Sequence, residues 1–524
     1  MHRRLFLTAS AGLAGAAAAP VRPFELDEIG TSELQSGLQS GRFTAESLTR
    51  LYLERIRAID KAGPAINAVI ELNPDAMSIA AALDRDFRAK GPRGPLHGVP
   101  VLIKDNIDTH DRMRTSAGSL ALAESIAPRD AFVVERLRAA GAVILGKTNL
   151  SEWANFRARH SVSAWSGRGG QTRLPYALDR NPSGSSSGSG AAVAANLCAL
   201  AVGTETDGSV ISPAAMNSLV GIKPTLGLVS RSGIIPIAHS QDTAGPMART
   251  VRDAAILLGA MAGADPRDPA TRASSEQPGD YRKFLDPKGL RGARLGVARK
   301  FTGNHAQVDR VFEQAIAEMK LQGAEIVDPA DLPTHATYKS SEWDVLAYEF
   351  KTDLNAYLAG LDRSVEVRSL ADLIAFNERH RDREMPYFGQ ETLILAEAKG
   401  PLTEKAYLDA LERNQRQTRE EGIDAVLRKH RLDAIIAPTS GPAWLIDWVH
   451  GDQDVADCTS PAAMAGYPHI TVPAGFVHGL PVGLSFFGAR WSEPVLLRLA
   501  YAFEQATKAR RAPKFLSTAQ FTKV

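Results

Sequence analysis

Cysteine is scarce in this sequence, and long hydrophobic runs are absent from it. Only Cys198 and Cys458 occur among 524 residues, which excludes a scaffold built on disulfides. Two buried, unreactive thiols are the favoured interpretation, and a single bridge in an oxidising compartment is the alternative. No stretch reaches the roughly 18 consecutive apolar residues that a membrane-spanning helix needs, so we expect no membrane insertion.

Excess charge of either sign is also missing. The chain has 61 Lys and Arg against 59 Asp and Glu. Arg3 and Arg4 lie in an N-terminal segment without acids, so the remainder carries 59 of each. This balance provides no long-range field for nucleic acid or an anionic membrane. It favours an uncharged substrate.

Motifs for metals and phosphates do not occur either. There is no His-Glu-x-x-His or paired Cys-x-x-Cys pattern, and the Gly/Ser-rich segment lacks the Gly-Lys-Ser/Thr of a phosphate loop. None of the twelve histidines stands in a pattern typical of a catalytic base; we interpret His239, His450 and His469 as structural or pocket residues. We predict no cofactor and no metal.

The N-terminus has the pattern of a twin-arginine export signal. Arg3 and Arg4 precede a moderately apolar, Gly/Ala-rich stretch from Leu5 to Ala19. We expect residues 1–19 to be a signal peptide, with cleavage near residues 16–18, and residues 20–524 to form the exported protein, periplasmic or secreted. A frayed N-terminal helix is the alternative.

The rest of the chain alternates buried strands with amphipathic helices, which predicts an α/β fold. Thr44 is the expected N-cap of the first helix. Strands are predicted at 99–103, 141–146, 293–297, 324–327, 434–437, 470–472 and 482–487, and helices at 44–60, 131–139, 191–197, 307–322 and 496–510. A loop is expected at 265–291 and a helical stretch at 343–430.

Three short segments carry the residues of a serine nucleophile activated without histidine. Lys104 ends the apolar run Gly98-Val-Pro-Val-Leu-Ile-Lys104, Ser185 lies in the Gly/Ser-rich segment 183–190, and Ser209 lies in Gly203-Thr-Glu-Thr-Asp-Gly-Ser209. A serine hydroxyl needs a base beside it. Lys104 can be that base if burial lowers its pKa well below the usual value of about 10.4.

The segment that ends at Ser209 also suits an oxyanion hole. The backbone amides of Thr206, Asp207 and Gly208 can curl round the oxygen that becomes negative during acyl transfer. A helix predicted to begin at Ala191 would present further free N–H groups to the site.

These segments, in this order and followed by Gly221-Ile-Lys-Pro-Thr225, resemble the amidase signature family. The likeness runs from about Thr44 to about Arg510. It implies a single large α/β/α domain around a mixed β-sheet. Carried over by motif, it implies Ser209 as the nucleophile, Ser185 as a bridging serine on a cis peptide and Lys104 as the terminal base.

Further segments are similar to the peptide amidase branch: residues 203–209, 229–236, 239–247 and 437–444. That branch hydrolyses the C-terminal carboxamide of peptides, so the expected partner is a peptide or small-molecule amide. The alternatives are an amidase of fatty or aryl amides and a glutamine-hydrolysing amidotransferase subunit, although the export signal argues against the latter. One more alternative is a non-catalytic binding protein of the same fold. The sequence sets neither the substrate nor the oligomeric state.

Two positions depart from the broader family pattern. Asp207 stands where glycine is usual, and Ile211 where arginine often follows the nucleophile. Aspartate tolerates left-handed backbone better than most residues, so an amide cradle can still form with aspartate at this position. Its charge repels an oxyanion unless the side chain points away or is paired. The missing arginine argues against a substrate held by a nearby carboxylate.

A rival nucleophile is Ser186, since residues 184–188 match the Gly-x-Ser-x-Gly elbow of α/β hydrolases. That elbow requires a buried strand directly before it, and the polar segment 176–182 disfavours one. Candidates for an apolar pocket, each with core packing as the alternative role, are Trp343, Tyr387, Phe388 and Trp444.

Overall fold

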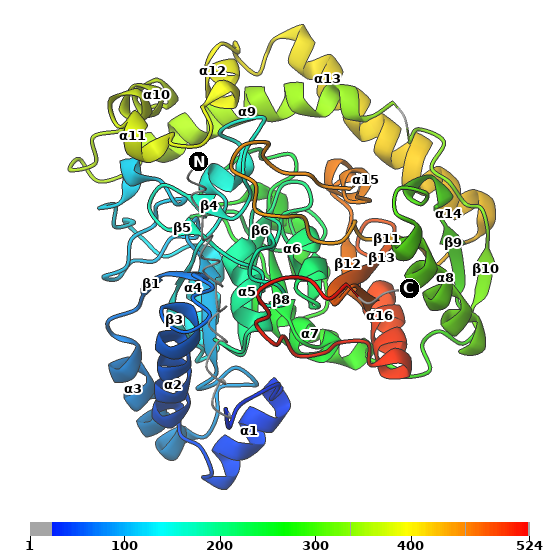
Figure 1. Ribbon diagram of the computed structural model, residues 1–524, viewed down its shortest axis with the longest axis horizontal. Coiled ribbons are helices and arrows are strands. Elements are labelled where there is room, and N and C mark those ends of the chain that lie inside the picture. The colour runs from blue at the N-terminus through cyan, green and yellow to red at the C-terminus, as the bar shows by residue number, and fades with distance from the viewer. Residues whose placement is uncertain (1–23, 336, 456, 522–524) are drawn as a thin grey trace, which may run out of the picture.

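One mixed eleven-stranded sheet with flanking helices organises the molecule (Figure 1). This computed structural model describes residues 24–335, 337–455 and 457–521; the predicted signal peptide, residues 1–19, lies outside them. The strand order is β1-β3-β2-β6-β8-β7-β12-β13-β11-β9-β10. The prediction of an α/β fold around a mixed sheet is confirmed.

The sheet mixes parallel and antiparallel neighbours. β2 runs parallel to β3 and β6, and β9 runs parallel to β10 and β11, whereas the other pairs are antiparallel. The strands are β1 (Val69–Leu72), β2 (Pro100–Lys104), β3 (Val143–Thr148), β6 (Leu200–Glu205), β7 (Val220–Lys223), β8 (Thr243–Ala248), β9 (Arg294–Val297), β10 (Glu325–Val327), β11 (Ala434–Pro438), β12 (His469–Val477) and β13 (Leu480–Phe487), with β4 (Trp165–Ser166) and β5 (Gly170–Gln171) forming a separate pair.

Helices contact the sheet near its β1 end and at its middle. α2 and α3 lie against β3, and α8 and α16 lie against β12. The helices are α1 (Thr31–Ser40), α2 (Ala45–Arg55), α3 (Ala76–Lys90), α4 (Phe132–Ala139), α5 (Ser187–Ala194), α6 (Ile211–Met216), α7 (Val251–Met261), α8 (Ala306–Leu321), α9 (Lys339–Ala359), α10 (Leu370–Arg379), α11 (Arg381–Glu384), α12 (Glu391–Glu397), α13 (Lys405–Thr418), α14 (Asp424–His430), α15 (Ser460–Ala465) and α16 (Glu493–Thr507).

The parallel strands β2, β3 and β6 end at the same edge of the sheet. Their residues are buried throughout, since the apolar runs before Lys104, Thr148 and Glu205 are covered on both faces. Polar side chains that follow such runs therefore meet at one edge, the position at which α/β sheets place their ligands.

The first predicted helix begins where expected. Thr44 caps α2: its hydroxyl accepts a hydrogen bond from Ser47 N–H at 3.0 Å, and Ser47 Oγ accepts one from Thr44 N–H at 2.9 Å. Beyond α2, residues Ile56–Asp60 continue as a π-helical turn that completes the predicted range of 44–60.

The helix predicted at 191–197 instead begins four residues earlier, at Ser187. The second half of the Gly/Ser-rich segment, residues 187–190, thus forms the first turn of α5, and residues 183–186 form the loop before it. Glycine is required here by close packing: a Cβ at Gly188 would lie 2.2 Å from the carbonyl oxygen of Ala68 and 2.5 Å from that of Asn149. Sequence propensity disfavours glycine in a helix, and tertiary packing overrides it.

Other elements were not predicted at all. α1 precedes the first expected helix, and the further unpredicted elements between the expected ones are β1, β4, β5, β7, β8, α3, α6, α7 and α15. Two 3₁₀ helices, Pro269–Glu276 and Tyr281–Phe284, interrupt the loop expected at 265–291. The predicted helical stretch 343–430 is confirmed as a series of helices, α9 to α14.

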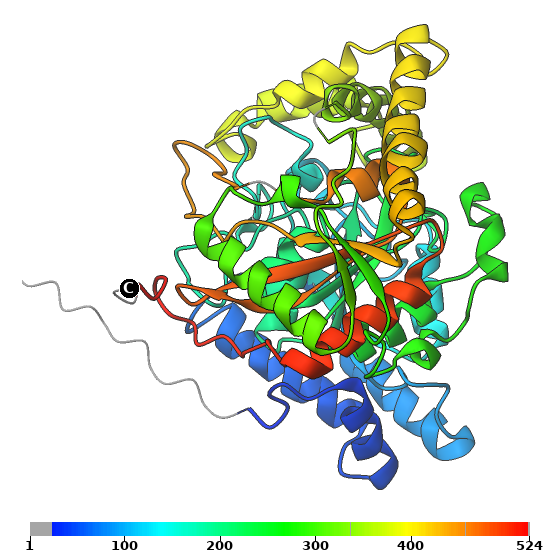
Figure 2. The ribbon, with the colours of Figure 1, turned by 90° about the vertical axis from the view of Figure 1, so that its right-hand side faces the viewer.

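Helices α9 to α13 form an arm that arches over the rest of the molecule (Figures 1 and 2). The arm is tied to the loop before β8. Glu349 of α9 accepts a hydrogen bond from Ser240 N–H at 2.9 Å and from the Tyr407 hydroxyl at 2.8 Å. His239 Nδ1 lies 2.8 Å from Asp353 Oδ2. The arm therefore contributes side chains to the edge at which β6 ends.

Both cysteines are buried and unpaired, as the favoured interpretation expected. None of the helices in the described part of the chain combines the length and the apolarity needed to cross a bilayer.

Replacing Thr44 by alanine should lower the free energy of unfolding by about 1 kcal/mol, because one N-terminal amide of α2 loses its acceptor. Thr44→Ser keeps the hydroxyl and serves as the matched control. Urea denaturation followed by circular dichroism measures both. A Thr44→Ala midpoint equal to that of the wild type would contradict a capping role.

Candidate active site

Lys104 ends β2 as a fully buried side chain. Its Nζ lies 2.8 Å from Ser185 Oγ, 2.9 Å from Thr204 Oγ1 and 3.2 Å from the Thr204 carbonyl oxygen. Burial lowers the pKa of Lys104 to about 7, although the carboxylates of Glu205 and Asp242 act in the opposite direction. A substantial fraction of this lysine is therefore neutral near pH 7.

The three neighbours of Lys104 suit a neutral amine. Such an amine has two N–H donors and one lone pair. The two oxygens of Thr204 can accept both N–H bonds, which leaves the lone pair for the hydroxyl proton of Ser185. Asn106 Nδ2 donates to the same Thr204 hydroxyl oxygen at 3.0 Å and holds it in place. This arrangement allows Lys104 to take a proton from Ser185.

Ser185 is fully buried and follows a cis peptide bond from Gly184. A Cβ at Gly184 would lie 2.2 Å from Ser151 Oγ, so only glycine fits. Ser151 N–H donates to the Ser185 carbonyl at 3.2 Å, and Ser186 N–H donates to the Ser209 carbonyl at 3.1 Å. These bonds place the turn at Ser185 directly beside the backbone of Ser209.

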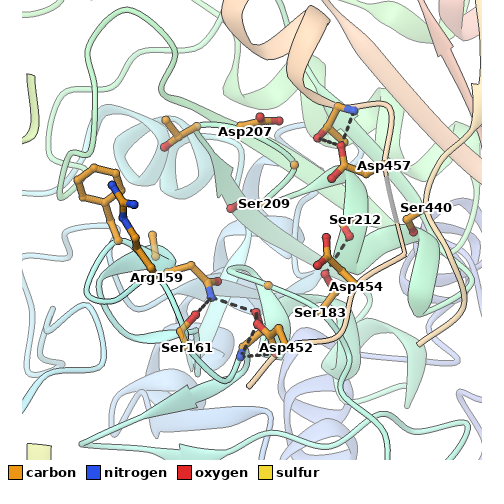
Figure 3. A pocket seen from close by; sticks show the side chains of 18 of the residues that line it. Arg159, Ser161, Ser183, Asp207, Ser209, Ser212, Ser440, Asp452, Asp454 and Asp457 are labelled. Carbon is orange, nitrogen blue, oxygen red and sulfur yellow. Dashed lines mark hydrogen bonds between the residues drawn. The ribbon is translucent and has the colours of Figure 1, made fainter. Parts of the chain in front are cut away.

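Ser209 follows β6 and lines a cavity of about 390 Å³, as Figure 3 shows. Its side chain is almost completely buried. Glu205 fixes the turn that follows, because its Oε2 accepts hydrogen bonds from Val210 N–H at 2.7 Å and Ile211 N–H at 2.9 Å. Gly184 lines the same cavity. The structure thus brings Lys104 and Ser185 into contact and places the Ser185 turn beside Ser209, which lines the cavity.

The predicted oxyanion loop has free donors. The backbone N–H groups of Thr206, Asp207, Gly208 and Ser209 have no hydrogen-bond acceptor within the described ranges of the chain. Two residues of the segment before β8, Asp242 and Gln241, hold the first residue of this loop. Thr206 Oγ1 donates to Asp242 Oδ1 at 2.5 Å, and Gln241 Nε2 donates to the Thr206 carbonyl at 3.3 Å. Unpaired amides in a fixed loop are what an oxyanion hole requires.

The left-handed residue of this loop is Gly208, at φ +75°, and not Asp207. The departure from glycine at position 207 therefore imposes no left-handed backbone on an aspartate. A Cβ at Gly208 would lie 3.0 Å from Thr459 Oγ1, which adds a steric reason for glycine.

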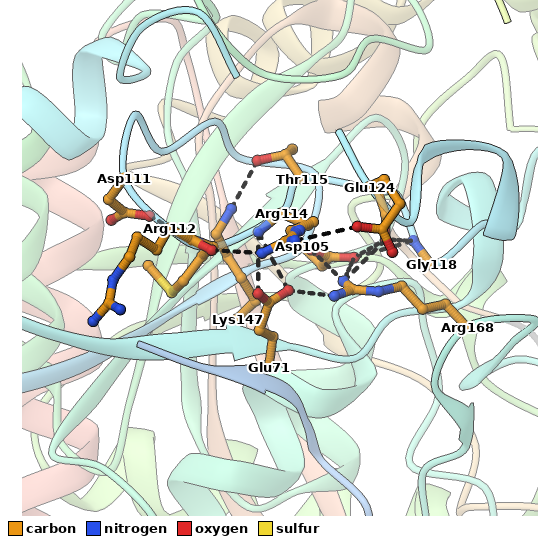
Figure 4. A network of polar contacts seen from close by, with 12 residues as sticks. Glu71, Asp105, Asp111, Arg112, Arg114, Thr115, Gly118, Glu124, Lys147 and Arg168 are labelled. Atoms are coloured by element: carbon orange, nitrogen blue, oxygen red, sulfur yellow. Dashed lines mark hydrogen bonds and ion pairs between the residues drawn. The ribbon is translucent and has the colours of Figure 1, made fainter. Parts of the chain in front are cut away.

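A separate polar network lies behind β2, at the ends of β1 and β3 (Figure 4). Asp105 accepts hydrogen bonds from Ser116 Oγ and from Gly118 N–H at 3.3 Å. Arg168 bridges Asp105 and Glu71. These contacts anchor the residue that directly follows Lys104.

A second buried lysine belongs to this network and not to the cavity. Lys147 of β3 donates to the Ile107 carbonyl at 2.6 Å and to Thr115 Oγ1 at 2.9 Å. Both acceptors are structural, so Lys147 ties the segment after β2 to β3. Of the two lysines at this sheet edge, Lys104 is the one that contacts Ser185.

A model of the family described as Amidase matches residues 47–497. The chain belongs to the amidase family. A probable amidase of Arabidopsis thaliana is 44% identical over 504 residues, which cover 94% of this chain and 93% of the relative. One of the subunits of the glutamyl-tRNA(Gln) amidotransferase of Pseudomonas aeruginosa is 37% identical over 506 residues, which cover 92% of this chain and 98% of the relative.

Among solved structures, native peptide amidase from Stenotrophomonas maltophilia is 52% identical, with a TM-score of 0.88 over 94% of this chain and 100% of that one. The predicted resemblance to the amidase signature family and its peptide amidase branch is confirmed. This chain is thus an amidase, a hydrolase that acts on amides.

Several residues that shape the site of this amidase were not assigned a role from sequence. Thr204 and Asp242 lie inside motifs that the sequence singles out, and Asn106 lies two residues after Lys104, yet their contacts depend on how β2, β6 and β8 pair. Glu342 of the helical arm also lines the cavity, and no local signal marks it. The contact between this arm and the sheet is a tertiary feature.

The predicted histidines and aromatic residues divide between several places. Trp343 and Trp444 line the cavity, whereas Tyr387 and Phe388 pack edge-on against Trp165. His239, His450 and His469 lie outside the cavity lining: His239 borders a second cavity, His450 is paired with Asp447, and His469 is buried beside Ser485.

The rival nucleophile Ser186 is occupied elsewhere. Its hydroxyl donates to the Thr204 carbonyl at 3.1 Å and accepts from Thr204 N–H at 3.2 Å. Residues 176–183, directly before the Gly-x-Ser-x-Gly match at 184–188, contain isolated bridge residues but no strand. The geometry therefore favours Ser209 over Ser186.

The pH dependence of kcat/KM should show an acidic limb near pH 7. Lys104 accepts a proton only when neutral, so activity should fall as pH falls through its pKa of about 7 and level off above it. Asp242→Asn is the control: removing a carboxylate that favours the ammonium should move this limb to lower pH. A profile that is flat from pH 5 to 9 would contradict a lysine base.

Proposed function

We propose that this amidase is a peptide amidase, which hydrolyses the C-terminal carboxamide of peptides to the acid and ammonia. The observation that carries the proposal is the contact between the buried Lys104 amine and Ser185, next to Ser209. The 52% identity to a peptide amidase over nearly the whole chain supports the substrate class.

In the proposed acylation step, Ser209 Oγ attacks the carboxamide carbon. Its proton passes to Ser185 Oγ, and the proton of Ser185 passes to the lone pair of Lys104 Nζ. The amides of residues 206–209 stabilise the tetrahedral oxyanion. Collapse breaks the C–N bond, and the proton returns through Ser185 to the leaving nitrogen, which departs as ammonia.

Deacylation repeats this proton path with water as the nucleophile. Water adds to the acyl carbon and gives a proton to Lys104 through Ser185. The Ser209 oxygen then leaves and regains a proton by the same route. The net reaction consumes one water and yields one acid and one ammonia, and the enzyme returns to its initial state.

The proposal includes export by the twin-arginine signal of residues 1–19 to the periplasm or the medium. Such export delivers folded proteins, which fits a large single sheet assembled from strands far apart in the sequence. Fractionation of a cell that expresses the full chain, with Arg3→Lys and Arg4→Lys as a double variant, tests this part.

A glutamine-hydrolysing role is the second candidate, because the relative from the glutamyl-tRNA(Gln) amidotransferase is 37% identical over most of both chains. Fatty and aryl amides are further substrate classes. Ammonia release from an amidated dipeptide, free glutamine and a simple aryl amide distinguishes them. Release from the amidated dipeptide alone is the expected result, and release from glutamine alone would overturn the proposal.

Ser209→Ala should reduce turnover of the amidated dipeptide by at least about a thousandfold, since nucleophile removal in serine hydrolases has effects of this size or larger. Its thermal unfolding should match that of the wild type. Ser186→Ala is the matched comparison for the rival nucleophile. A Ser209→Ala enzyme that keeps most of its activity would contradict the assignment.

A further inference from the structure

The cavity that holds Ser209 is lined by several carboxyl groups (Figure 3). They come from the loop after β6, from α9 of the arm and from the segment between β11 and α15. Asp452 has a structural role, since it accepts hydrogen bonds from Ser163 and from Trp444 Nε1. Asp454 is exposed at the rim and has Lys339 as a neighbouring cation. Three carboxyl groups remain, those of Asp207, Glu342 and Asp457, which we call the acidic wall.

The acidic wall has no ion-pair partner among the described residues. Within residues 24–335, 337–455 and 457–521, no lysine, arginine or histidine forms an ion pair with Asp207, Glu342 or Asp457. Arg159 and His160 also line the cavity, and both are exposed. No ion pair therefore neutralises the wall, although the buried Lys223 interacts electrostatically with Asp207.

Two of these groups, Asp207 and Glu342, have raised pKa values and therefore favour the protonated form more than ordinary carboxyl groups do. Burial and the neighbouring Asp207 carboxylate raise the pKa of Glu342 well above its usual value, and burial and Asp457 raise the pKa of Asp207. Asp207 Oδ1 is buried and has no hydrogen-bond partner among the described residues. A buried acceptor without a partner is costly unless a ligand supplies the donor.

The acidic wall lies close to the reacting atoms. Asp207 is two residues before Ser209, so their Cα atoms are at most about 7 Å apart. Asp457 accepts a hydrogen bond from Thr459 Oγ1 at 2.9 Å, the atom that packs against Gly208 of the oxyanion loop. When they are ionised, carboxyl groups at this distance oppose the oxyanion that forms on the substrate, and a nearby cation favours their ionised form. A positive charge on the substrate would offset that repulsion.

We propose that the substrate of this amidase carries a positive charge near the scissile carboxamide, and that Asp207, Glu342 and Asp457 recognise it. The inference rests on the proposed function. The cation is an ammonium or guanidinium, supplied either by the free N-terminus of a short peptide amide or by a basic side chain. The same wall repels the carboxylate product and any acidic substrate.

The test compares kcat/KM for matched dipeptide amides that share a C-terminal phenylalaninamide. N-acetyl-lysyl and N-acetyl-norleucyl substrates differ in a side-chain cation, and alanyl and N-acetyl-alanyl substrates differ in the N-terminal ammonium. We expect at least a tenfold preference for the cationic member of one pair, and the pair that shows it identifies the source. Equal values within both pairs would overturn the inference and leave the peptide amidase function intact.

Variants then locate the recognition. Asp457→Asn and Glu342→Gln remove charge but keep an oxygen acceptor for Thr459 and Gln241, respectively. Each should reduce the preference for the cation at least fivefold, whereas Glu412→Gln, an exposed acid of α13, should not change it. Thermal unfolding checks that each variant folds.

Two further outcomes are decisive. A full cation preference in both Asp457→Asn and Glu342→Gln would overturn the role of the acidic wall. No turnover of any of the four amides by the wild type would overturn the proposed function and this inference together.

Discussion

Burial of the Lys104 amine at the end of β2 is the constraint on which the arrangement of the site depends. An ammonium taken out of water loses its hydration, so the neutral form gains in relative stability. The surrounding oxygens of Thr204 can receive two N–H bonds, and Ser185 faces the remaining position. In water a lysine side chain is charged at pH 7. Because the fold excludes water from Lys104, part of this lysine is neutral near pH 7 and can accept a proton.

The neighbouring elements at this edge of the sheet hold Lys104, Ser185 and the loop of Ser209 in position. β2 is an interior strand, with β3 and β6 on either side, and the Asp105 network fixes the chain directly after Lys104. The small residues at the start of α5 allow this helix to pack closely: at Gly188, a Cβ would collide with the carbonyl oxygens of Ala68 and Asn149. Asp242 and Glu205 hold the two ends of the loop that contains Ser209. Their charges also keep the pKa of Lys104 from falling further.

The acidic wall adds a second electrostatic feature to the same cavity. Lys104 lies on the buried side of Ser185, whereas Asp207, Glu342 and Asp457 lie on the side open to a substrate. The overall charge of the chain is nearly zero, so this local field is invisible in the composition. An uncharged substrate, which composition alone favoured, is thus replaced in our proposal by a cationic one.

Sequence patterns predicted the buried strands and the motif residues well, because apolar runs such as 99–103 carry their own signal. They failed for β8 (Thr243–Ala248), because glycine and proline in this segment disfavour a strand. The segment is extended because it pairs with β6 and β7. The start of α5 was wrong because packing against Ala68 and Asn149 outweighs the low helix propensity of glycine. Glu342 lies 133 positions after Ser209, and only the folded arm brings it to the cavity.

The central claim is that Lys104 is neutral in the working enzyme, and its titration measures this directly. Lysine labelled with ¹³C at Cε gives one resonance per lysine, and a Lys104→Met variant assigns the one that matters. The account predicts a titration midpoint near pH 7 for this resonance. A Lys104 that stays charged up to pH 10 would contradict it.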